Sequence, residues 1–236
     1  MGSTRLPGKV LRRLGDHSML EAILFRVREA RLVNKIIVAT TTLAPDDAIA
    51  RLCERLHTEC FRGSSENVLS RYYEAAKANS VDIIVRLTGD NPLVDPRIVG
   101  NAVAEFLRKT SRGKAEFMAT TGYPIGINVE MMTFECLKKV VSLARRADEL
   151  EHVTLYVHRH AKSFRVATMS SPVALDTLRL TVDDMSDLRF VRKIYDGLSG
   201  STSVFGLPEI LCFLLDHPSL PGPVTRSHGS NSVRSL

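Results

Sequence analysis

Short apolar segments alternate with amphipathic helical patterns through the first half of this chain. Residues 35–40 (Lys-Ile-Ile-Val-Ala-Thr) and 82–88 (Asp-Ile-Ile-Val-Arg-Leu-Thr) are rich in β-branched residues, as in strands that are covered on both faces. Residues 18–31 begin with a Ser18-x-x-Glu21 capping box, followed by apolar residues at helical spacing. This alternation predicts an α/β fold with a doubly wound, mostly parallel sheet.

The same patterns predict the remaining elements. Helices are expected at residues 18–31, 45–57, 66–78, 96–109, 133–146, 150–160, 186–198 and 207–215, and strands at 35–40, 60–62, 82–88, 115–120, 127–130, 164–169 and 178–182. A length of 236 residues fits one sizeable α/β domain or two small ones, and we expect residues 1–220 to form a single domain. Residues 221–236 are rich in Pro, Ser, Gly and Arg and lack apolar periodicity, which predicts a disordered tail.

The net charge of +6 and the pI near 9.3 raise the question of a nucleic-acid partner. The basic residues are scattered over the predicted helices, aromatic residues make up only 6% and Trp is absent, so no stacking surface for bases is indicated. No segment has the length of a membrane span, and we expect neither a nucleic-acid nor a membrane partner. The cysteines show no metal-ligand spacing, which predicts reduced thiols in a cytoplasmic protein; they are Cys53, Cys60, Cys136 and Cys212.

The first nine residues, Met-Gly-Ser-Thr-Arg-Leu-Pro-Gly-Lys, have the composition of a phosphate-binding loop. Glycines let a backbone approach a ligand closely, the hydroxyl of Ser3 can donate a hydrogen bond, and Arg5 and Lys9 can neutralise phosphate charge. A flexible terminus with two solvated cations is the alternative interpretation.

Acidic side chains follow two of the predicted strands. Asp90 comes after residues 82–88, and Asp183 and Asp184 come after residues 178–182. Ligands of parallel sheets bind outside the carboxyl ends of the strands, and two converging carboxylates can hold Mg²⁺ together with substrate phosphates. Alternatively, Asp90 belongs to a Gly-Asp-Asn-Pro turn, and Asp183 or Asp184 caps the following helix.

Five stretches together resemble the sugar cytidylyltransferases, the group that contains the acylneuraminate and 3-deoxy-manno-octulosonate cytidylyltransferases. They are Gly2–Lys9 (GSTRLPGK), Phe61–Ser64 with Val68–Tyr73 (FRGS, VLSRYY), Arg86–Pro96 (RLTGDNPLVDP), Glu151–Thr154 (EHVT) and Arg179–Asp183 (RLTVD). Within this group the chain is most similar to the spore-coat polysaccharide biosynthesis branch. The resemblance implies a Rossmann-like fold of the nucleotide-diphospho-sugar transferase type.

The resemblance also implies roles for individual residues. Ser3, Arg5 and Lys9 would bind the CTP phosphates, with Lys9 and Arg5 as the catalytic cations, and Arg62 would approach the nucleotide. Asp90 and Asp183 would bind Mg²⁺. The sugar-binding and subunit-contacting elements of residues 121–160 would include Tyr123, Glu130, Glu151 and His152. His152 is expected in or near the active cleft, with His158 and His160 on the surface.

The implied reaction is the attack of a sugar hydroxyl on the α-phosphate of CTP, which gives a CMP-sugar and pyrophosphate in surface-polysaccharide biosynthesis. CTP and a sugar acid or related sugar are the expected substrates, Mg²⁺ the expected cofactor and a homodimer the expected assembly. Two other interpretations stay open. One is a catalytically impaired relative that binds nucleotide or acts as a scaffold, and the other is a glycosyltransferase that consumes a nucleotide-sugar.

The sequence departs from the family pattern in three places. The family has a hydrophobic strand ending in Gln-Ala-Arg before the Met-Gly-Ser segment, so we expect the first central strand to be missing here. The family turn Pro-Asp-Gly-x-Asp-x-Glu reads Pro-Ile-Gly-Ile-Asn-Val-Glu at residues 124–130, without two of its acids. The family helix start Thr-Pro-Glu-Asp reads Asp-Met-Ser-Asp at residues 184–187, which can still begin a helix.

Overall fold

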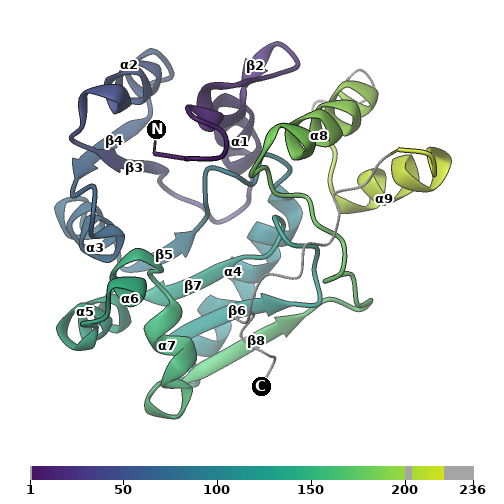
Figure 1. Cartoon of the computed structure of the whole chain (residues 1–236). Helices are drawn as coiled ribbons and strands as arrows, with labels where there is room; N and C mark the ends of the chain where they lie inside the picture. Colours follow the sequence, from purple (N-terminus) through teal and green to yellow (C-terminus); the bar gives the residue numbers. More distant parts are fainter. Residues whose placement is uncertain (1, 200–203, 221–236) are drawn as a thin grey trace.

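The computed structural model describes residues 2–199 and 204–220. The predicted tail, residues 221–236, lies outside the described residues. Strands β3 (Ile37–Thr41) and β4 (Glu59–Gly63) form a parallel pair, and a separate four-stranded sheet has the order β5 (Ile83–Arg86), β7 (Glu130–Thr133), β6 (Phe117–Thr121), β8 (Val166–Ser170). Figure 1 shows the pair at the upper left and the four-stranded sheet in the lower half of the view.

Strand β7 is the exception to a common strand direction in the larger sheet. It runs antiparallel to both β5 and β6, whereas β6 and β8 are parallel. The expected α/β fold is therefore confirmed, and the larger sheet is mixed, because β7 is an inserted strand of opposite direction.

Strands β3 and β5 are not hydrogen-bonded to each other, so the strands form two separate sheets. Among the described residues, β3 pairs only with β4 and β5 pairs only with β7. Each strand thus has one edge without a backbone partner there. Most residues of both strands are only half-buried, which is unusual for the interior strands of an α/β sheet.

Helices lie along both sheets. They are α1 (Met19–Arg28), α2 (Asp47–Arg55), α3 (Val68–Ala78), α4 (Pro96–Thr110), α5 (Phe134–Leu143), α6 (Ala147–Glu151), α7 (Leu155–Arg159), α8 (Met185–Leu198) and α9 (Leu207–Asp216). Short 3₁₀ turns precede β1 (Arg13–Leu14), precede α2 and follow α7; they are η1 (Lys9–Leu11), η2 (Ala44–Asp46) and η3 (Ala161–Ser163). The predicted capping box is present, since Ser18 N–H donates to Glu21 at 2.7 Å and the Ser18 hydroxyl accepts from Glu21 N–H at 3.3 Å.

The larger sheet is covered on both faces, as a doubly wound fold requires. Successive residues of a strand point to opposite faces, and Phe117 and Met118 of β6 enter two different apolar clusters. Met118 packs in the cluster that contains Phe106 of α4, and Phe117 packs in the cluster that contains Leu137 of α5. Helix α4 therefore covers one face, and α3 and α5 cover the other.

Two expectations about secondary structure were wrong, and one small element was not foreseen. The helix expected at residues 150–160 is broken into α6 and α7, because His152–Thr154 leave the helical path and Val153 is buried in the core. Residues 178–182 do not form a strand but an extended segment with a single bridge between Ile125 and Arg179. A small hairpin, β1 (Arg13–Leu14) and β2 (His17–Ser18), was not foreseen.

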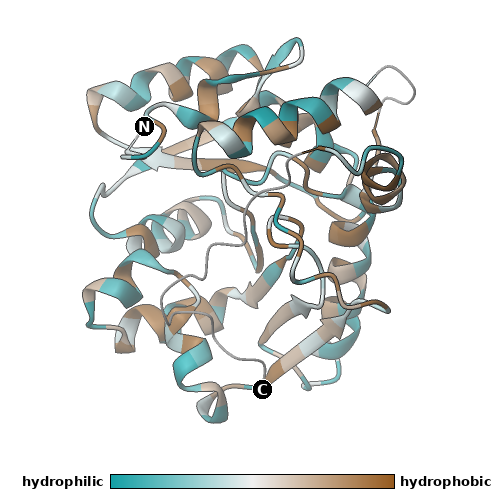
Figure 2. Cartoon of the chain, turned by 45° about the vertical axis from the view of Figure 1, so that its right-hand side comes forward, coloured by the Kyte–Doolittle hydropathy of each residue, from teal (hydrophilic) through white to brown (hydrophobic). Residues whose placement is uncertain are grey.

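Helix α9 lies at the edge of the molecule and packs against α8. Figure 2 shows it as a largely apolar helix. Leu207 and Ile210 are buried, whereas Leu215 is exposed. Among the described residues, no helix is both long enough and apolar enough to cross a membrane.

Candidate functional site

The side chain of Lys9 contacts both Asp90 and Asp183. Its Nζ lies 3.1 Å from Asp90 Oδ2 and 3.2 Å from Asp183 Oδ1, and it donates to the backbone carbonyl of Val182 at 2.9 Å. The Lys9 side chain is only 15% exposed, so this contact is sheltered from solvent. Three stretches that are remote in the sequence thus meet at one ammonium group.

The loop that carries Lys9 is fixed by backbone geometry. Leu6 is buried in the main core, and Lys9 N–H donates to its carbonyl at 3.1 Å. Gly8 has a left-handed φ of 66° directly before η1, a conformation that glycine adopts without strain. A side chain at Gly89 would lie 2.9 Å from Val10, so a glycine there permits the close approach of the two loops.

The turn after β5 orients the carboxylate of Asp90. The Thr88 hydroxyl donates to Asp90 Oδ1 and accepts from the Asn91 side-chain amide at 3.0 Å. Oδ1 is thereby held by its own turn, while Oδ2 faces Lys9. The turn interpretation and the ligand interpretation of Asp90 are therefore compatible.

Asp183 reaches the site because residues 178–182 run between two other loops. Leu180 N–H donates to the Ile125 carbonyl at 2.7 Å, and Val182 N–H donates to the Asp90 carbonyl at 2.8 Å. The neighbouring Asp184 is the cap of α8, where it accepts hydrogen bonds from the first-turn N–H groups. The open alternative is thus resolved, because Asp184 caps the helix and Asp183 faces Lys9.

Three cations surround Asp183. Besides Lys9, Arg179 donates to Asp183 Oδ2, and Arg5 lies 3.4 Å from the same oxygen. Burial raises the pKa of Asp183, but the charges of Lys9, Arg5 and Arg179 together outweigh burial, so the pKa lies below its ordinary value. Arg179 is in turn held by the buried Asp187 at 2.8 Å, which fixes its position.

This carboxylate pair fits a divalent metal. One oxygen of Asp90 and one of Asp183 converge on the same point, and the Lys9 ammonium occupies that point as a stand-in cation. Among the described residues, no group of three or more His, Cys, Asp or Glu side chains is arranged so that it could hold a metal ion. Two carboxylates with further oxygen ligands from water and phosphate are the usual protein contribution to a Mg²⁺ site.

Glu130, at the start of β7, forms a second acidic centre and is bound by three donors. Arg86 and His158 each contact a different carboxylate oxygen at 2.7 Å, and the Thr154 hydroxyl donates at 3.0 Å. Burial raises the pKa of Glu130, but the hydrogen bonds and the charge of Arg86 outweigh it and lower the pKa. Glu130 lies opposite Arg86 in the β5–β7 register, so the strand pairing itself brings these two side chains together.

The surroundings of Glu130 are also tightly packed. The His158 ring meets the buried Phe117 ring edge-on at 5.3 Å. The Tyr72 hydroxyl donates to the Leu87 carbonyl at 3.1 Å, and burial raises its pKa. Arg86 Nε is buried without a hydrogen-bond partner among the described residues. The expectation that His158 lies on the surface was therefore wrong, because His158 links α7 to Glu130 of β7.

Comparison with known proteins decides the family. The family model described as cytidylyltransferase matches residues 1–192. The chain belongs to the cytidylyltransferase family. The spore coat polysaccharide biosynthesis protein SpsF of Bacillus subtilis is 33% identical over 225 residues, which cover 92% of each chain.

Solved structures agree with this family assignment. A cytidylyltransferase from Leptospira borgpetersenii has a TM-score of 0.89 and 30% identity, and the match covers 97% of this chain and 95% of that one. A CMP:2-keto-3-deoxy-manno-octonic acid synthetase complexed with CTP has a TM-score of 0.63 and 17% identity over 83% of this chain and 95% of that one, which shows a shared fold. The chain is thus a nucleotidyltransferase of α/β fold, and the predicted resemblance is confirmed.

The other phosphate-binding candidates of this cytidylyltransferase lie at different places. The Ser3 hydroxyl accepts from Leu6 N–H at 3.2 Å and so shapes the opening loop, and the half-exposed Arg5 reaches Asp183. Arg62 donates to the Thr41 and Leu43 carbonyls and lies 2.7 Å from Asp47. Arg62 therefore links β4 to β3 and α2, and it does not contact Lys9, Asp90 or Asp183.

The predicted sugar-binding residues do not gather around Glu130. Tyr123 lines a mostly apolar hollow of about 420 Å³ near the start of α4 and α9. Glu151 and His152 are exposed at the end of α6, and within the described part of the chain their side chains make no recorded hydrogen bond or ion pair. His158, which was expected on the surface, is the histidine that lies next to Glu130. Its spacing of four residues from Thr154 was the available signal, since both then lie on one helical face.

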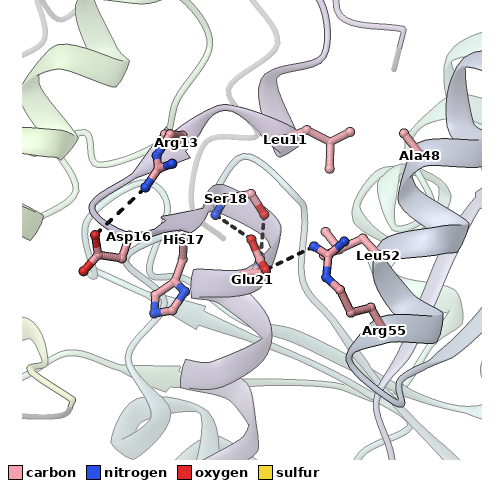
Figure 3. Close-up of a pocket in the computed structure, with 9 residues that line it drawn as sticks. All are labelled: Leu11, Arg13, Asp16, His17, Ser18, Glu21, Ala48, Leu52 and Arg55. Carbon is pink, nitrogen blue, oxygen red and sulfur yellow. Dashed lines mark hydrogen bonds and ion pairs between the residues drawn. The ribbon is translucent and has the colours of Figure 1, made fainter.

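A further recess of about 320 Å³ lies between the β1–β2 hairpin and α2. Glu21 is one of its lining residues, and Figure 3 shows it between Ser18 and Arg55, which bind it at 2.7 Å and 3.4 Å. The Arg55 and Arg13 side chains are largely exposed, and Asp16 is fully so. The recess is therefore an open surface feature whose half-buried acid, Glu21, is already paired, and the contact of Lys9 with Asp90 and Asp183 remains the stronger candidate.

Proposed function

We propose that this cytidylyltransferase transfers CMP from CTP to a sugar acid or a related sugar and releases pyrophosphate. We further propose that it requires Mg²⁺, serves surface-polysaccharide biosynthesis and acts as a cytoplasmic homodimer of a single domain spanning residues 1–220. The family description and the similarity to a spore coat polysaccharide protein support the reaction class. The solved synthetase that carries CTP supports the choice of nucleotide, and the dimer is proposed from the family resemblance alone.

One observation carries the proposal: the contact of Lys9 with both Asp90 and Asp183. A nucleoside triphosphate needs cations for its phosphates and carboxylates for its metal, and both kinds of group converge here. Asp90 Oδ2 and Asp183 Oδ1 would hold Mg²⁺, which when bound supplies positive charge to the phosphate oxygens. Lys9, Arg5 and the Ser3 hydroxyl lie on the adjacent loop and would contact the phosphates.

The reaction needs no covalent intermediate on the protein. The sugar hydroxyl oxygen attacks the α-phosphorus, the bond from that phosphorus to the bridging oxygen of the β-phosphate breaks, and pyrophosphate leaves with the electron pair. The hydroxyl proton is released to solvent or to pyrophosphate. Negative charge moves to the departing oxygens, and the fixed charges of Lys9 and Arg5 would stabilise that charge.

For the sugar, we propose the edge of the sheet at Glu130. Arg86 and His158 lie there, on the same carboxyl side of β5 as Asp90, which is where ligands of α/β sheets bind. Because Glu130 is already bound by three donors, it would act by orienting Arg86 and His158. Tyr123, Glu151 and His152 stay predictions for the sugar site, and Arg62 for the nucleotide.

The proposed function is tested by pyrophosphate release. The purified protein is incubated with CTP, Mg²⁺ and either 3-deoxy-manno-octulosonate or N-acetylneuraminate, with ATP, GTP and UTP in parallel. We expect pyrophosphate and a CMP-sugar in equal amounts, only with CTP and only with metal. Lys109→Ala, which removes a lysine of α4 far along the chain from the site, serves as the matched control for Lys9→Ala.

Other outcomes would contradict the proposal in different ways. CTP binding without pyrophosphate release from any sugar would point to a nucleotide-binding relative without turnover. The separation of β3 from β5 is the observation that keeps this second candidate in view. Release of a nucleoside diphosphate from a nucleotide-sugar would instead identify a glycosyltransferase.

A further inference from the structure

The ammonium of Lys9 has no donor left for a phosphate. A lysine has three N–H donors, and the three oxygens around Nζ belong to Asp90, Asp183 and Val182 at 2.9–3.2 Å. A group in this arrangement cannot bind both its present partners and a triphosphate. The structure therefore shows Lys9 in a state that has to change before it can act on substrate.

The two carboxylates are held so that they need a cation between them. Thr88 fixes the far oxygen of Asp90, and Arg179 fixes the far oxygen of Asp183. Neither carboxylate can turn away without losing these hydrogen bonds. Two acids facing one another in a partly buried place repel each other unless a positive charge lies between them. Lys9 supplies this charge in the present structure.

Departure of Lys9 needs little rearrangement of the chain. The side chain is a flexible four-carbon stem, whereas its backbone is anchored through Leu6 and the turn at Gly8. Rotation of the stem alone can withdraw the ammonium from the carboxylates. Arg5 already lies beside Asp183 with its side chain about half exposed, so the loop keeps a cation at the site during the exchange.

We infer that Lys9 is the resident counter-ion of the Asp90–Asp183 pair in the metal-free protein, and that a divalent metal displaces it. The same event that loads the metal then frees the ammonium for the phosphates. Metal and Lys9 compete for the same two oxygens, so each weakens the binding of the other. The inference rests on the proposed metal site, and it adds that phosphate binding by Lys9 is coupled to metal binding.

The test measures the reactivity of Lys9 directly. The protein is pulsed with acetic anhydride with and without Mg²⁺, and acetylation of each lysine is read by mass spectrometry. No nucleotide is added, because phosphates would themselves cover Lys9. Mg²⁺ is expected to raise the labelling rate of Lys9 by about fivefold or more. Lys109 is the matched internal control, because it also contacts a carboxylate at 3.4 Å and a backbone carbonyl at 3.3 Å, and its rate should not change.

A second measurement separates this inference from the proposed function. Mn²⁺ binding is followed by electron paramagnetic resonance in the wild type, Lys9→Met and Lys109→Met. Lys9→Met should bind Mn²⁺ about tenfold more tightly than the wild type, since the competitor is gone, and Lys109→Met should match the wild type.

Each outcome decides something. The inference would be overturned if metal binds but does not change the labelling rate of Lys9, and if Lys9→Met does not change the affinity for Mn²⁺. The proposed function would stand in that case. Absence of Mn²⁺ binding in both the wild type and Lys9→Met, with pyrophosphate release intact, would also overturn the inference alone. Absence of metal binding together with absence of pyrophosphate release would overturn both.

Discussion

Two acid centres lie at the same side of this molecule, and they use their cations differently. Glu130 is held by Arg86, Thr154 and His158, which belong to β5 and to the α6–α7 region. Asp90 and Asp183 are bridged by Lys9, which is the first residue of η1 and directly follows the opening loop. The donors to Glu130 come from packed elements, whereas Lys9 reaches its acids through a flexible four-carbon side chain. We infer from this difference that Glu130 serves the fold and that Asp90 and Asp183 serve a ligand.

The largest expected effect is on catalysis. Asp90→Asn keeps the shape of the side chain but removes half of the proposed metal site, and Lys9→Ala removes the proposed phosphate cation. Either change should lower the rate of pyrophosphate release by about 10²–10³-fold or more. Steady-state assays and thermal melts would be run together, and a variant that melts like the wild type yet keeps full activity would contradict the assigned role.

The next effect is on stability at the other centre. Glu130→Ala should lower the free energy of unfolding by about 3–5 kcal/mol, because it leaves Arg86 partly buried without its acid. Urea denaturation measures the change. Glu151→Ala is the control, since Glu151 is exposed at the end of α6, and its effect should stay within about 0.5 kcal/mol. Equal effects of the two variants would remove the distinction drawn here.

Acid should weaken the Glu130 centre. The pKa of Glu130 in the folded protein lies below its ordinary value of 4.5, so its ionised form stabilises the fold at pH values above about 4.5. This contribution is lost as the pH falls through the lowered pKa. The difference in unfolding free energy between the wild type and Glu130→Gln should therefore shrink when urea denaturation is repeated from pH 6 down to pH 3. A difference that grew in acid would show that Glu130 is stabilised in its protonated form.

The smallest effect is expected from the neutral donor. Thr154→Val keeps the volume of the side chain but removes its hydrogen bond to Glu130, and it should cost about 1 kcal/mol. Arg86 and His158 remain in place in this variant, so pyrophosphate release should be unchanged. A loss as large as that of Glu130→Ala would mean that Thr154, and not the charged pair, maintains the centre.

The sequence predicted much of the fold because local signals agreed with tertiary packing. Ser18 and Glu21 form the capping box that their spacing predicts, and α4 begins at Pro96 after the cap Asp95. Residues 178–182 were mistaken for a strand. Leu180 and Val182 are buried, but the backbone of this segment bonds to the loops at Ile125 and Asp90, which no local pattern predicts.

The candidate site was predictable only where its residues occur in motifs. Lys9, Asp90 and Asp183 meet as expected, because each lies in a stretch with a distinct signature. Glu130 was expected to bind sugar, but its partners Arg86 and His158 come from β5 and α7, and only the strand register and the break of the helix at His152–Thr154 bring them together. Such pairings depend on the whole fold.

The most direct test of the central claim is Mn²⁺ binding, in the presence of CTP, by three forms of the protein. Electron paramagnetic resonance would compare the wild type with Asp183→Asn and Glu130→Gln at neutral pH and at a temperature where all are folded. The account predicts that Asp183→Asn loses the bound metal and that Glu130→Gln retains it. Metal binding that survives in Asp183→Asn, or disappears in Glu130→Gln, would contradict it.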